Sequence, residues 1–429
     1  MTPEVKKRIE QIRQGIVPEG YVKDKDGIYP RDWASKKIGQ WLKLAERSIV
    51  LQDEEEYQLV TIRRGFGGVD SRGSFLGKNV LVKNYFIVKT GDFIISKRQI
   101  AHGACGIVPP ELDGAVVSNE YNVFLPQDGT NIQMFNLMMQ LPHYKRLFYL
   151  MSDGVHIEKL LFKTQDWMKR TLAMPLLKEQ KKIAEILSTQ DKAIELQGRK
   201  IEELKRFKKG CLEKMFPKKG QKVPEKRFPG FTDDWEQRKL TEFVEFFSGL
   251  TYTPNDVQEN GTLVLRSSNV SNGEVVDADN VYVNPQVVNS ENVKVGDIVV
   301  VVRNGSRSLI GKHAQIKTFM PNTVIGAFMT GIRSECPKFT NALLNTSRFE
   351  EEIAMNMGAT INQITGYMFS KMEFKVPCLD EQKEIGEYFE NLDHLITLHQ
   401  RKLDEMKKQK KALMQLLLTG IVKTKGEVR

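Results

Sequence analysis

Two stretches of the chain carry apolar residues at alternating spacings of three and four, which is the spacing of one face of a long helix. The first stretch covers residues 175–216 and the second covers residues 377–420. Lys, Arg, Glu and Gln fill most other positions, so each pattern predicts an amphipathic helix with a coiled-coil seam. The predicted seam consists of Ile183, Leu187, Ile194, Ile201, Leu204, Ile385, Phe389, Ile396, Leu403 and Met406.

The two helical stretches are copies of one another. Shifted by 202 residues, the 42 positions that start at Pro175 and at Pro377 align without a gap, and 16 of them are identical. Two such seams in one chain are buried most simply against each other, and two similar units related by a rough two-fold axis would pair them antiparallel. Gln197 and His399 occupy the same polar seam position, so we expect them to fix the register of the pair.

Two blocks of equal length accompany the helices, and in both of them short apolar or alternating runs are broken by Gly, Asn and Pro. They cover residues 29–174 and 231–376, which is 146 residues each. This pattern predicts strand-rich domains with short helices near residues 134–150 and 340–355. The predicted fold class is α+β, with two strand-rich domains in a pseudo-two-fold arrangement, separated by two long antiparallel coiled-coil helices.

Three shorter segments complete the predicted organisation. Residues 1–28 form an N-terminal segment with a short helix, and residues 421–429 form a tail. Residues 217–230 contain three prolines and five basic residues, so they form a linker that is not helical throughout.

Composition and charge indicate a folded protein with a polyanionic partner. Hydrophobic residues make up 40% and charged residues 28% of the chain, which excludes global disorder. Lys and Arg number 64 against 54 Asp and Glu, a net charge of +10 that favours nucleic acid as partner. The N-terminus is charged, and no apolar run approaches the ~18 residues of a membrane span, so we expect a cytoplasmic protein.

Motifs that would indicate catalysis or metal binding are missing from the sequence. The glycine-rich segments do not have the spacing of a phosphate-binding P-loop, and there is no Asn/Asp-Pro-Pro-aromatic loop of a methyltransferase. The four cysteines are widely separated and form no CxxC pair. We therefore expect a chain with no catalytic residue, no metal site and no cofactor of its own.

Polar clusters in the divergent loops of the two blocks are the candidate DNA-binding residues. Arg and Lys can donate to guanine, and Asn and Gln can bond adenine at two atoms, so these residue types suit reading of the major groove. Nearby lysines would hold phosphates. The candidates are Arg63, Arg64, Arg72, Lys97, Arg98, Gln99, His102 and Asn119 in the first block, and Arg266, Ser268, Asn269, Arg303, Asn304, Arg307, Lys312, Asn362 and Gln363 in the second.

The order of these features resembles that of the specificity subunit of a type I restriction-modification enzyme, over essentially the whole chain. The resemblance rests on the P-L-x-x-EQK-x-I helix start at Pro175 and its weaker copy at Pro377, and on Trp33 and Trp235 at the starts of the blocks. It also rests on the V-x-x-GD-hydrophobic runs around Asp92 and Asp297 and on the LLTG ending at 417–420. The first helix departs from the second at its end, where KKGCLEKMF replaces KKALMQLLL.

The resemblance implies a non-catalytic, sequence-specific DNA-binding subunit of a host defence system. Each block resembles a target recognition domain that reads one half of a split double-stranded DNA site. The helices would fix the gap between the half-sites and dock two methyltransferase subunits, to which restriction and motor subunits add. Those partners would bind S-adenosylmethionine, ATP and magnesium, and would perform adenine methylation and ATP-dependent cleavage.

Two other classes of function remain open at this point. One is an enzyme in its own right, a fused nuclease or methyltransferase, which cofactor binding by the isolated chain would favour. The other is a coiled-coil adaptor without a nucleic-acid role, which the absence of salt-dependent duplex binding would favour.

Overall fold

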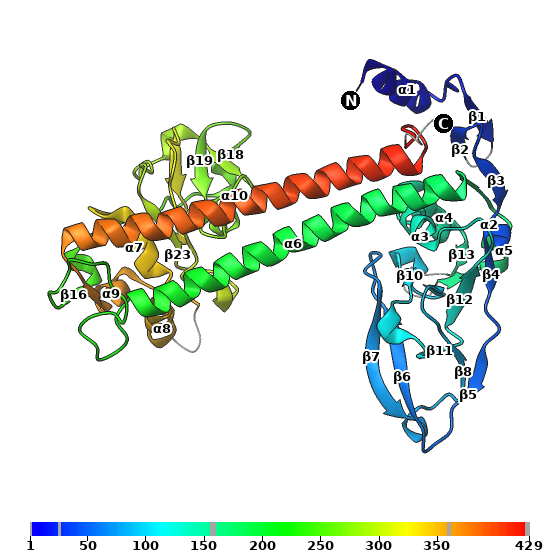
Figure 1. Ribbon diagram of the computed structural model, residues 1–429. Coiled ribbons are helices and arrows are strands. Elements are labelled where there is room, and N and C mark those ends of the chain that lie inside the picture. Colours follow the sequence, from blue (N-terminus) through cyan, green and yellow to red (C-terminus); the bar gives the residue numbers. More distant parts are fainter. Residues whose placement is uncertain (1, 25–26, 155–159, 358–361, 425–429) are drawn as a thin grey trace. The chain divides into compact units, whose positions relative to one another are not determined.

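A computed structural model describes residues 2–24, 27–154, 160–357 and 362–424 of the chain. It contains two compact units: unit 1 comprises Met1–Leu196 and Leu403–Arg429, and unit 2 comprises Gln197–Lys402. Two long helices, α6 (Leu177–Met215) and α10 (Leu379–Leu418), contribute to both units (Figure 1). The predicted α+β class and both long helices are confirmed. Each helix is slightly shorter than predicted, because Pro175 and Pro377 precede the first helical turn.

The two helices run antiparallel in each unit, as predicted. In unit 1, Lys410 of α10 donates to Asp191 of α6 over 2.5 Å. In unit 2, Lys208 of α6 donates to Asp393 of α10 over 2.6 Å. Asp393 lies 202 residues after Asp191, and Lys410 lies 202 residues after Lys208. The duplicated sequence therefore makes the same interhelical ion pair twice, with the roles of α6 and α10 exchanged.

The polar seam residues meet each other. The Nε2 atom of Gln197 lies 2.9 Å from Nδ1 of His399 and donates to the His399 carbonyl oxygen over 2.8 Å. Along the seam, Ile183, Leu187, Ile201, Leu204, Ile385, Phe389 and Leu403 are buried, whereas Ile194, Ile396 and Met406 are half-buried. A polar pair among apolar seam residues is satisfied only in one register, which is the role that the sequence suggested for it.

Two sheets form the block of unit 1. The four-stranded antiparallel sheet has the order β10 (Cys105–Ile107), β9 (Phe93–Ser96), β12 (Tyr121–Pro126) and β4 (Leu42–Leu44). The five-stranded sheet has the order β5 (Ser48–Val50), β8 (Asn84–Ile87), β11 (Val116–Ser118), β6 (Glu56–Ile62) and β7 (Val69–Leu76), with β11 and β6 parallel. Short runs of β-branched and aromatic residues between turns produce these strands.

The core of unit 1 is centred on Trp167, which is fully buried. Its ring lies 5.6 Å from those of Phe124 and Phe162 and 5.8 Å from that of Phe148, measured between centroids. The helices around it are α2 (Ile38–Trp41), α3 (Ile132–Met139), α4 (Pro142–Leu150) and α5 (Thr164–Met168), and β13 (Ser152–Asp153) pairs with β14 (Leu161–Phe162). The core therefore joins the four-stranded sheet to the helices that cover it.

Unit 2 repeats this plan with two four-stranded sheets. One has the order β17 (Val244–Ser248), β26 (Met329–Ser334), β23 (Ile298–Val301) and β24 (His313–Gln315). The other has the order β18 (Val257–Gln258), β22 (Val281–Val283), β19 (Thr262–Leu265) and β25 (Thr323–Ile325), with β19 and β25 parallel. A small hairpin joins β20 (Val270–Ser271) to β21 (Glu274–Val275).

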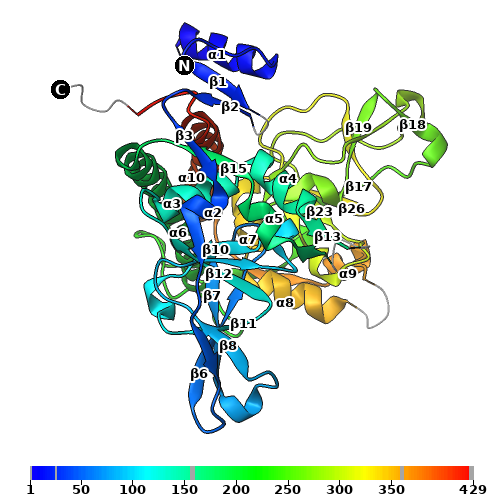
Figure 2. The ribbon, with the colours of Figure 1, turned by 90° about the vertical axis from the view of Figure 1, so that its right-hand side faces the viewer.

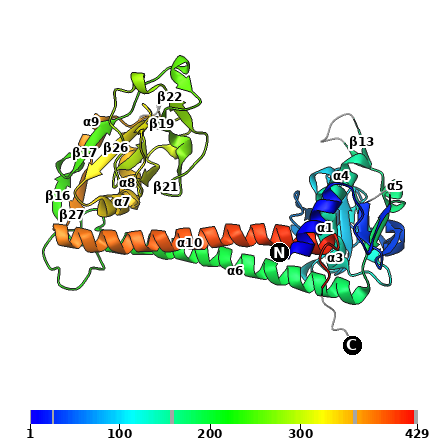
Figure 3. The same ribbon diagram turned by 90° about the horizontal axis from the view of Figure 1, so that it is seen from above.

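Helix α7 (Pro337–Leu344) lies between the strands of unit 2 and α10 (Figure 3). Phe339 of α7 stacks on Phe216 with ring centroids 5.7 Å apart, and Phe216 in turn lies 6.1 Å from Phe389 of α10. Helices α8 (Ser347–Asn356) and α9 (Gly366–Ser370) follow α7. This aromatic cluster fixes the block of unit 2 to the first turns of α10.

Both blocks are closed by a pair of strands at matching positions. In unit 1, β3 (Ala34–Lys37) pairs antiparallel with β15 (Thr171–Met174). In unit 2, β16 (Glu236–Lys239) pairs with β27 (Glu373–Val376) in the same register. β16 and β27 lie 202 residues after β3 and β15. In each block the first strand is therefore paired with the last one, and the long helix begins directly after the last strand.

The duplicated Gly-Asp pairs form one kind of turn in both blocks. Gly91 and Gly296 adopt positive φ angles of 86° and 96°, which a residue with a Cβ atom adopts only with strain. The following aspartates are buried, and each accepts the backbone N–H three residues earlier: Asp92 from Lys89 over 2.7 Å and Asp297 from Lys294 over 2.8 Å. Arg47 pairs with Asp92, and Arg333 donates twice to Asp297.

The EQK motif ties each helix start to its block through the glutamine. Gln180 donates to the carbonyl oxygens of Pro175 and Gly129 over 2.8 and 2.9 Å, and its own oxygen accepts from Asn131 N over 2.7 Å. Gln382 donates in the same way to Pro377 over 2.9 Å. The motif therefore marks the junction between a block and the helix that follows it.

The N-terminal segment lies beside the end of α10 in unit 1 (Figure 2). It consists of α1 (Pro3–Arg13), at the position of the predicted short helix, and a hairpin of β1 (Tyr21–Asp24) and β2 (Gly27–Pro30). The Tyr21 hydroxyl donates to the Gly420 carbonyl oxygen over 2.7 Å. Gly420 has a φ of +69°, and a Cβ atom there would come within 2.9 Å of Trp33, so the LLTG ending requires glycine.

Candidate nucleic-acid interface

The first cluster of candidate residues lies where the β6–β7 hairpin meets the turn after β9. The hairpin tip is held by two backbone bonds, from Gly65 N to His102 O over 2.7 Å and from Phe66 N to Gly103 O over 2.8 Å. Arg63 and Arg64 are therefore brought beside Gln99 and His102, although about 35 residues separate them in sequence. Both arginines are exposed, and Arg63 forms an ion pair with Asp70.

The remaining candidates of the first block lie close to this tip. The backbone N–H of Lys97 donates to Glu120 O over 2.9 Å, and Nε of Arg98 donates to the Glu120 carboxylate over 2.6 Å, next to Asn119. Burial raises the pKa of Tyr121, and the positive charge of Arg72 on β7 opposes that rise. The structure thus gathers all eight first-block candidates at one end of the block.

In unit 2, the loop after β19 and the loop before β26 enclose an open hollow of about 510 Å³. Arg266, Ser267 and Ser268 line one side, and Tyr252 and Phe328 contribute aromatic rings. Arg266 donates to the Asp279 carboxylate over 2.5 Å and to its carbonyl oxygen over 2.7 Å. The side chain of Phe328 is 55% exposed, which is unusual for a residue of this size.

Arg303 is held differently from three other candidate arginines. Arg63, Arg98 and Arg266 each bind a carboxylate. The Arg303 guanidinium carbon instead lies over the Phe328 ring, 5.0 Å from its centroid. A cation–π contact orients the flat guanidinium without using its N–H groups, and no hydrogen bond from them to another of the described residues is found.

Asn304, Asn362 and Gln363 form one polar loop with Arg303. The backbone of Arg303 makes an isolated antiparallel bridge with that of Gln363. Asn304 donates to the Ser267 hydroxyl over 3.0 Å, and Asn362 donates to Gly305 O over 3.1 Å. Arg307 and Lys312 lie in the same segment between β23 and β24, with Arg307 exposed and Lys312 half-buried.

Asn269 differs from the other candidates because it is buried. It is 1% exposed, and its amide donates to Ala278 O over 2.7 Å and to the Asn280 side chain over 2.9 Å. Its oxygen accepts the backbone N–H of Arg266 over 2.9 Å. These bonds use the amide to close the loop that carries Arg266, so the side chain is not available to a base edge.

We therefore expect Asn269→Ala to lower the free energy of unfolding by about 1–3 kcal/mol, since it leaves buried backbone groups without partners. Ser268→Ala, at the exposed neighbouring position, should change stability by no more than about 0.5 kcal/mol. Urea unfolding of both variants measures the difference. A stable Asn269→Ala protein that no longer distinguishes one base pair would contradict the structural role.

Sequence patterns did not single out the aromatic residues near the candidate DNA-binding residues. Tyr252, Phe328 and Tyr121 lie in or next to apolar runs, where an aromatic residue is ordinarily part of the core. Phe328 lies outside the buried strands, three residues after β25 ends and directly before β26 begins.

Neither a metal centre nor a membrane span is found in the part of the chain that the structure describes. Within residues 2–24, 27–154, 160–357 and 362–424, His, Cys, Asp and Glu side chains form no group of three or more that could hold an ion. In the same ranges, no helix combines the length and the apolar character that crossing a bilayer requires.

Comparison with known proteins identifies the duplicated element. The family model described as "Type I restriction modification DNA specificity domain" matches the chain twice, over residues 30–206 and 232–408. The two matches start 202 residues apart, which is the shift of the internal duplication. Each match covers one block together with most of the helix that follows it.

Individual relatives agree with the family model. The type I restriction enzyme MjaVIII specificity subunit of Methanocaldococcus jannaschii is 25% identical over 424 residues, covering 92% of this chain and 94% of its own length. The StySPI specificity subunit of Salmonella potsdam is 26% identical over 200 residues, covering 44% of this chain and 43% of its own.

Two solved structures share the fold. A chain from a study of complex assembly and conformational transition of the type I R-M system matches with a TM-score of 0.57 and 16% identity, over 92% of this chain and 99% of that one. The type I restriction-modification S subunit from M. genitalium matches with a TM-score of 0.55 and 14% identity, over 90% and 96%.

Proposed function

The chain belongs to the family of type I restriction-modification specificity subunits, with two DNA specificity domains, and from this premise we propose that each domain reads one half of a split DNA target. The observation that supports this most directly is the contrast between skeleton and loops. The first and last strands of one block correspond to those of the other at a shift of 202 residues. The loops that carry the candidate residues, in contrast, differ in sequence between the two blocks. Two modules of one fold with different polar surfaces suit two different sequences.

The long helices would act as a ruler and as a docking surface. A helix of about 40 residues is about 60 Å long, which is enough to separate two modules by more than one ~34 Å turn of DNA. We propose that two methyltransferase subunits dock on these helices and that restriction and motor subunits add to them. Specificity subunits are themselves non-catalytic, and the candidate residues described above would bind DNA only.

The chemistry of the complex would therefore lie on its partners. Methyltransferase subunits would bind S-adenosylmethionine and methylate adenine, and motor subunits would use ATP and Mg²⁺ to cleave unmodified DNA. We place this complex in the cytoplasm, where it would defend the host against foreign DNA. The specificity chain would contribute the choice of sequence and the geometry of assembly.

Mapping of adenine methylation tests the proposal directly. A host genome is compared with and without this chain, in the presence of its methyltransferase partner. A new split motif with one fixed gap is the expected result, and it would reveal both half-sites. A contiguous palindromic motif would contradict the arrangement of two reading domains on a ruler.

Substitutions of single arginines should then separate the two half-sites. We expect Arg303→Ala to reduce discrimination at one base pair of one half-site by about 1–3 kcal/mol, which is roughly 5- to 150-fold, because it removes a bidentate donor. Arg98→Ala should affect only the other half-site, so each variant is the control for the other. Methylation rates on duplexes with single base changes provide the measurement. An equal effect of either variant on both half-sites would contradict modular reading.

A further inference from the structure

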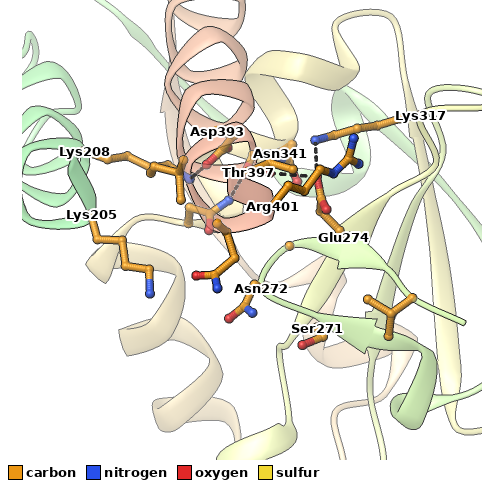
Figure 4. Close-up of a pocket in the computed structure, with 15 residues that line it drawn as sticks. Lys205, Lys208, Ser271, Asn272, Glu274, Lys317, Asn341, Asp393, Thr397 and Arg401 are labelled. Carbon is orange, nitrogen blue, oxygen red and sulfur yellow. Dashed lines mark hydrogen bonds and ion pairs between the residues drawn. The ribbon is translucent and has the colours of Figure 1, made fainter. Parts of the chain in front are cut away.

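A polar hollow of about 260 Å³ lies between the block and the helices of unit 2 (Figure 4). The turn of the β20–β21 hairpin forms one wall, and residues of α10 and α6 form the opposite wall. The aromatic cluster around Phe389 already anchors the block to the start of α10. The hollow marks a second place where the block approaches α10, further along that helix.

One carboxylate joins the two walls. The Thr397 hydroxyl on α10 donates to Oε1 of Glu274 on β21 over 3.0 Å, and Lys317, which follows β24, donates to the same oxygen over 3.3 Å. The Glu274 and Lys317 side chains are 31% and 37% exposed, so water reaches this contact only partly. Lys317 holds the Glu274 carboxylate toward Thr397, and we call these three residues the hairpin latch.

The helix wall is itself braced at this level. Lys208 and Asp393, which join α6 to α10, both line the hollow, and their side chains are only 14% and 27% exposed. The hairpin latch therefore fastens the block to a part of the helix pair that is already held firmly. The position in α6 that matches Thr397 is Glu195, whose carboxylate has no hydroxyl donor to offer. The latch thus depends on residues that the duplication did not preserve.

A contact further along α10 restricts rotation of the block more than the Phe389 cluster and the adjacent Lys338–Glu390 ion pair do by themselves. Thr397 follows Phe389 by eight residues, which is about 12 Å along a helix. A freedom of about 1 Å at the second anchor corresponds to a tilt of about 5°, and this moves a surface about 30 Å from the pivot by about 2.5 Å. The rise of one base pair is about 3.4 Å, so a small tilt of a reading domain approaches one step of the gap.

We propose that the hairpin latch holds the second reading domain at one angle on its helices, and that Glu274 and Thr397 thereby act as positioning residues that set the accuracy of the gap length. This inference rests on the proposed function and adds to it: the helices set the mean gap, and the latch excludes gaps one base pair longer or shorter. The half-sites themselves are read elsewhere, at the loops around Arg303 and Arg98.

The test uses the complex of this chain with its methyltransferase partner. Three duplexes carry both half-sites with the native gap, with one base pair fewer and with one base pair more, and methylation rates give the preference for the native gap. We expect Thr397→Val and Glu274→Ala to lower this preference at least tenfold, with little loss of rate on the native gap. Thr397→Ser, which keeps the hydroxyl, should retain the wild-type preference.

Two controls separate the latch from general effects. Glu202→Ala removes an exposed ion pair with Lys205 inside α6 and should leave the gap preference unchanged. Thermal unfolding shows whether each variant is folded, and the more conservative Thr397→Val is decisive if Glu274→Ala is unstable. A folded Thr397→Val complex with the wild-type gap preference would overturn the inference, and so would altered recognition of the bases in a half-site.

Failure of the proposed function is visible separately from failure of the latch. It would appear with the wild-type complex, as methylation that needs no split site or that shows no gap preference. Failure of the latch alone would leave a wild-type complex that prefers one gap, together with variants that prefer it equally.

Discussion

A complex whose specificity chain carries seven extra residues in both long helices should methylate the same two half-sites with a longer gap between them. We choose insertion points directly after Gln197 and directly before His399, so that the two added segments face each other and the Gln197–His399 contact across the helix pair is kept. Seven residues preserve the coiled-coil seam on either side of the insertion. The added segments would lie between the Asp191–Lys410 and Lys208–Asp393 ion pairs, so both ion pairs keep their partners.

The size of the effect follows from helix geometry. Seven residues add about 10 Å at 1.5 Å per residue. One base pair of DNA adds about 3.4 Å, so the gap should lengthen by at most about three base pairs. The increase is smaller if the helices cross the DNA axis at an angle. The change should appear as a complete replacement of the methylated motif, which makes it the largest functional effect that we predict.

Genome-wide methylation mapping measures the new gap. The same seven residues placed in α6 alone shift one seam against the other, so that variant should lose stability and activity together. A variant in which seven residues of each helix are replaced by the inserted sequence, so that the helix length is unchanged, provides a control for the altered sequence. An unchanged gap in the doubly inserted chain would show that the helices are not the ruler.

The sequence was sufficient to predict the skeleton, because the skeleton follows from periodicity and repetition. The spacing of Ile183 and Leu187 predicts a helix, and the 202-residue shift predicts that a second copy has the same fold. The matched strands β3–β15 and β16–β27 are the structural result of that shift, and the two Gly-Asp turns recur at a shift of 205 residues. Local spacing and internal repetition determine these features, so they can be predicted from a single sequence.

The candidate DNA-binding surface could be predicted only in part, because the surroundings of a polar residue depend on neighbours that are distant in sequence. Asn269 and Asn304 look alike as loop asparagines, yet one is buried by contacts from 276–280 and the other lies in an accessible loop. Phe328 lies against the guanidinium of Arg303, which follows a different strand. Residue type indicates what a side chain can bind, and the tertiary fold decides whether it is free to do so.

The glutamates of the EQK motifs show a similar limit. An acidic residue in the first turn of a helix is ordinarily explained by the helix dipole. Glu381, however, is fully buried, and Arg227 donates to both of its oxygens over 2.7 and 2.8 Å. The arginine lies 154 residues earlier in the chain, in the linker, so no local pattern connects the two. In unit 1, burial raises the pKa of Glu179, while a backbone hydrogen bond from Thr424 and the charge of Lys423 oppose that rise.

Glu381→Ala should therefore be the most destabilising single substitution among those considered, by about 3–5 kcal/mol in the free energy of unfolding. The reason is the arginine that remains. The Arg227 side chain is only 15% exposed, and without the carboxylate its charge stays largely removed from water with no partner. The effect should be near the lower end of that range if water reaches the freed guanidinium.

Denaturant unfolding of the specificity chain measures this loss, with two variants as controls. Asp234→Ala breaks the nearby ion pair with Lys222, in which the Asp234 side chain is 57% exposed and the Lys222 side chain 72% exposed. This substitution should lower the free energy of unfolding by no more than about 1 kcal/mol. The double variant Arg227→Met with Glu381→Met removes both charges, and it should be more stable than Glu381→Ala because no buried charge is left alone. A Glu381→Ala chain as stable as Asp234→Ala would show that the linker is not held by this ion pair.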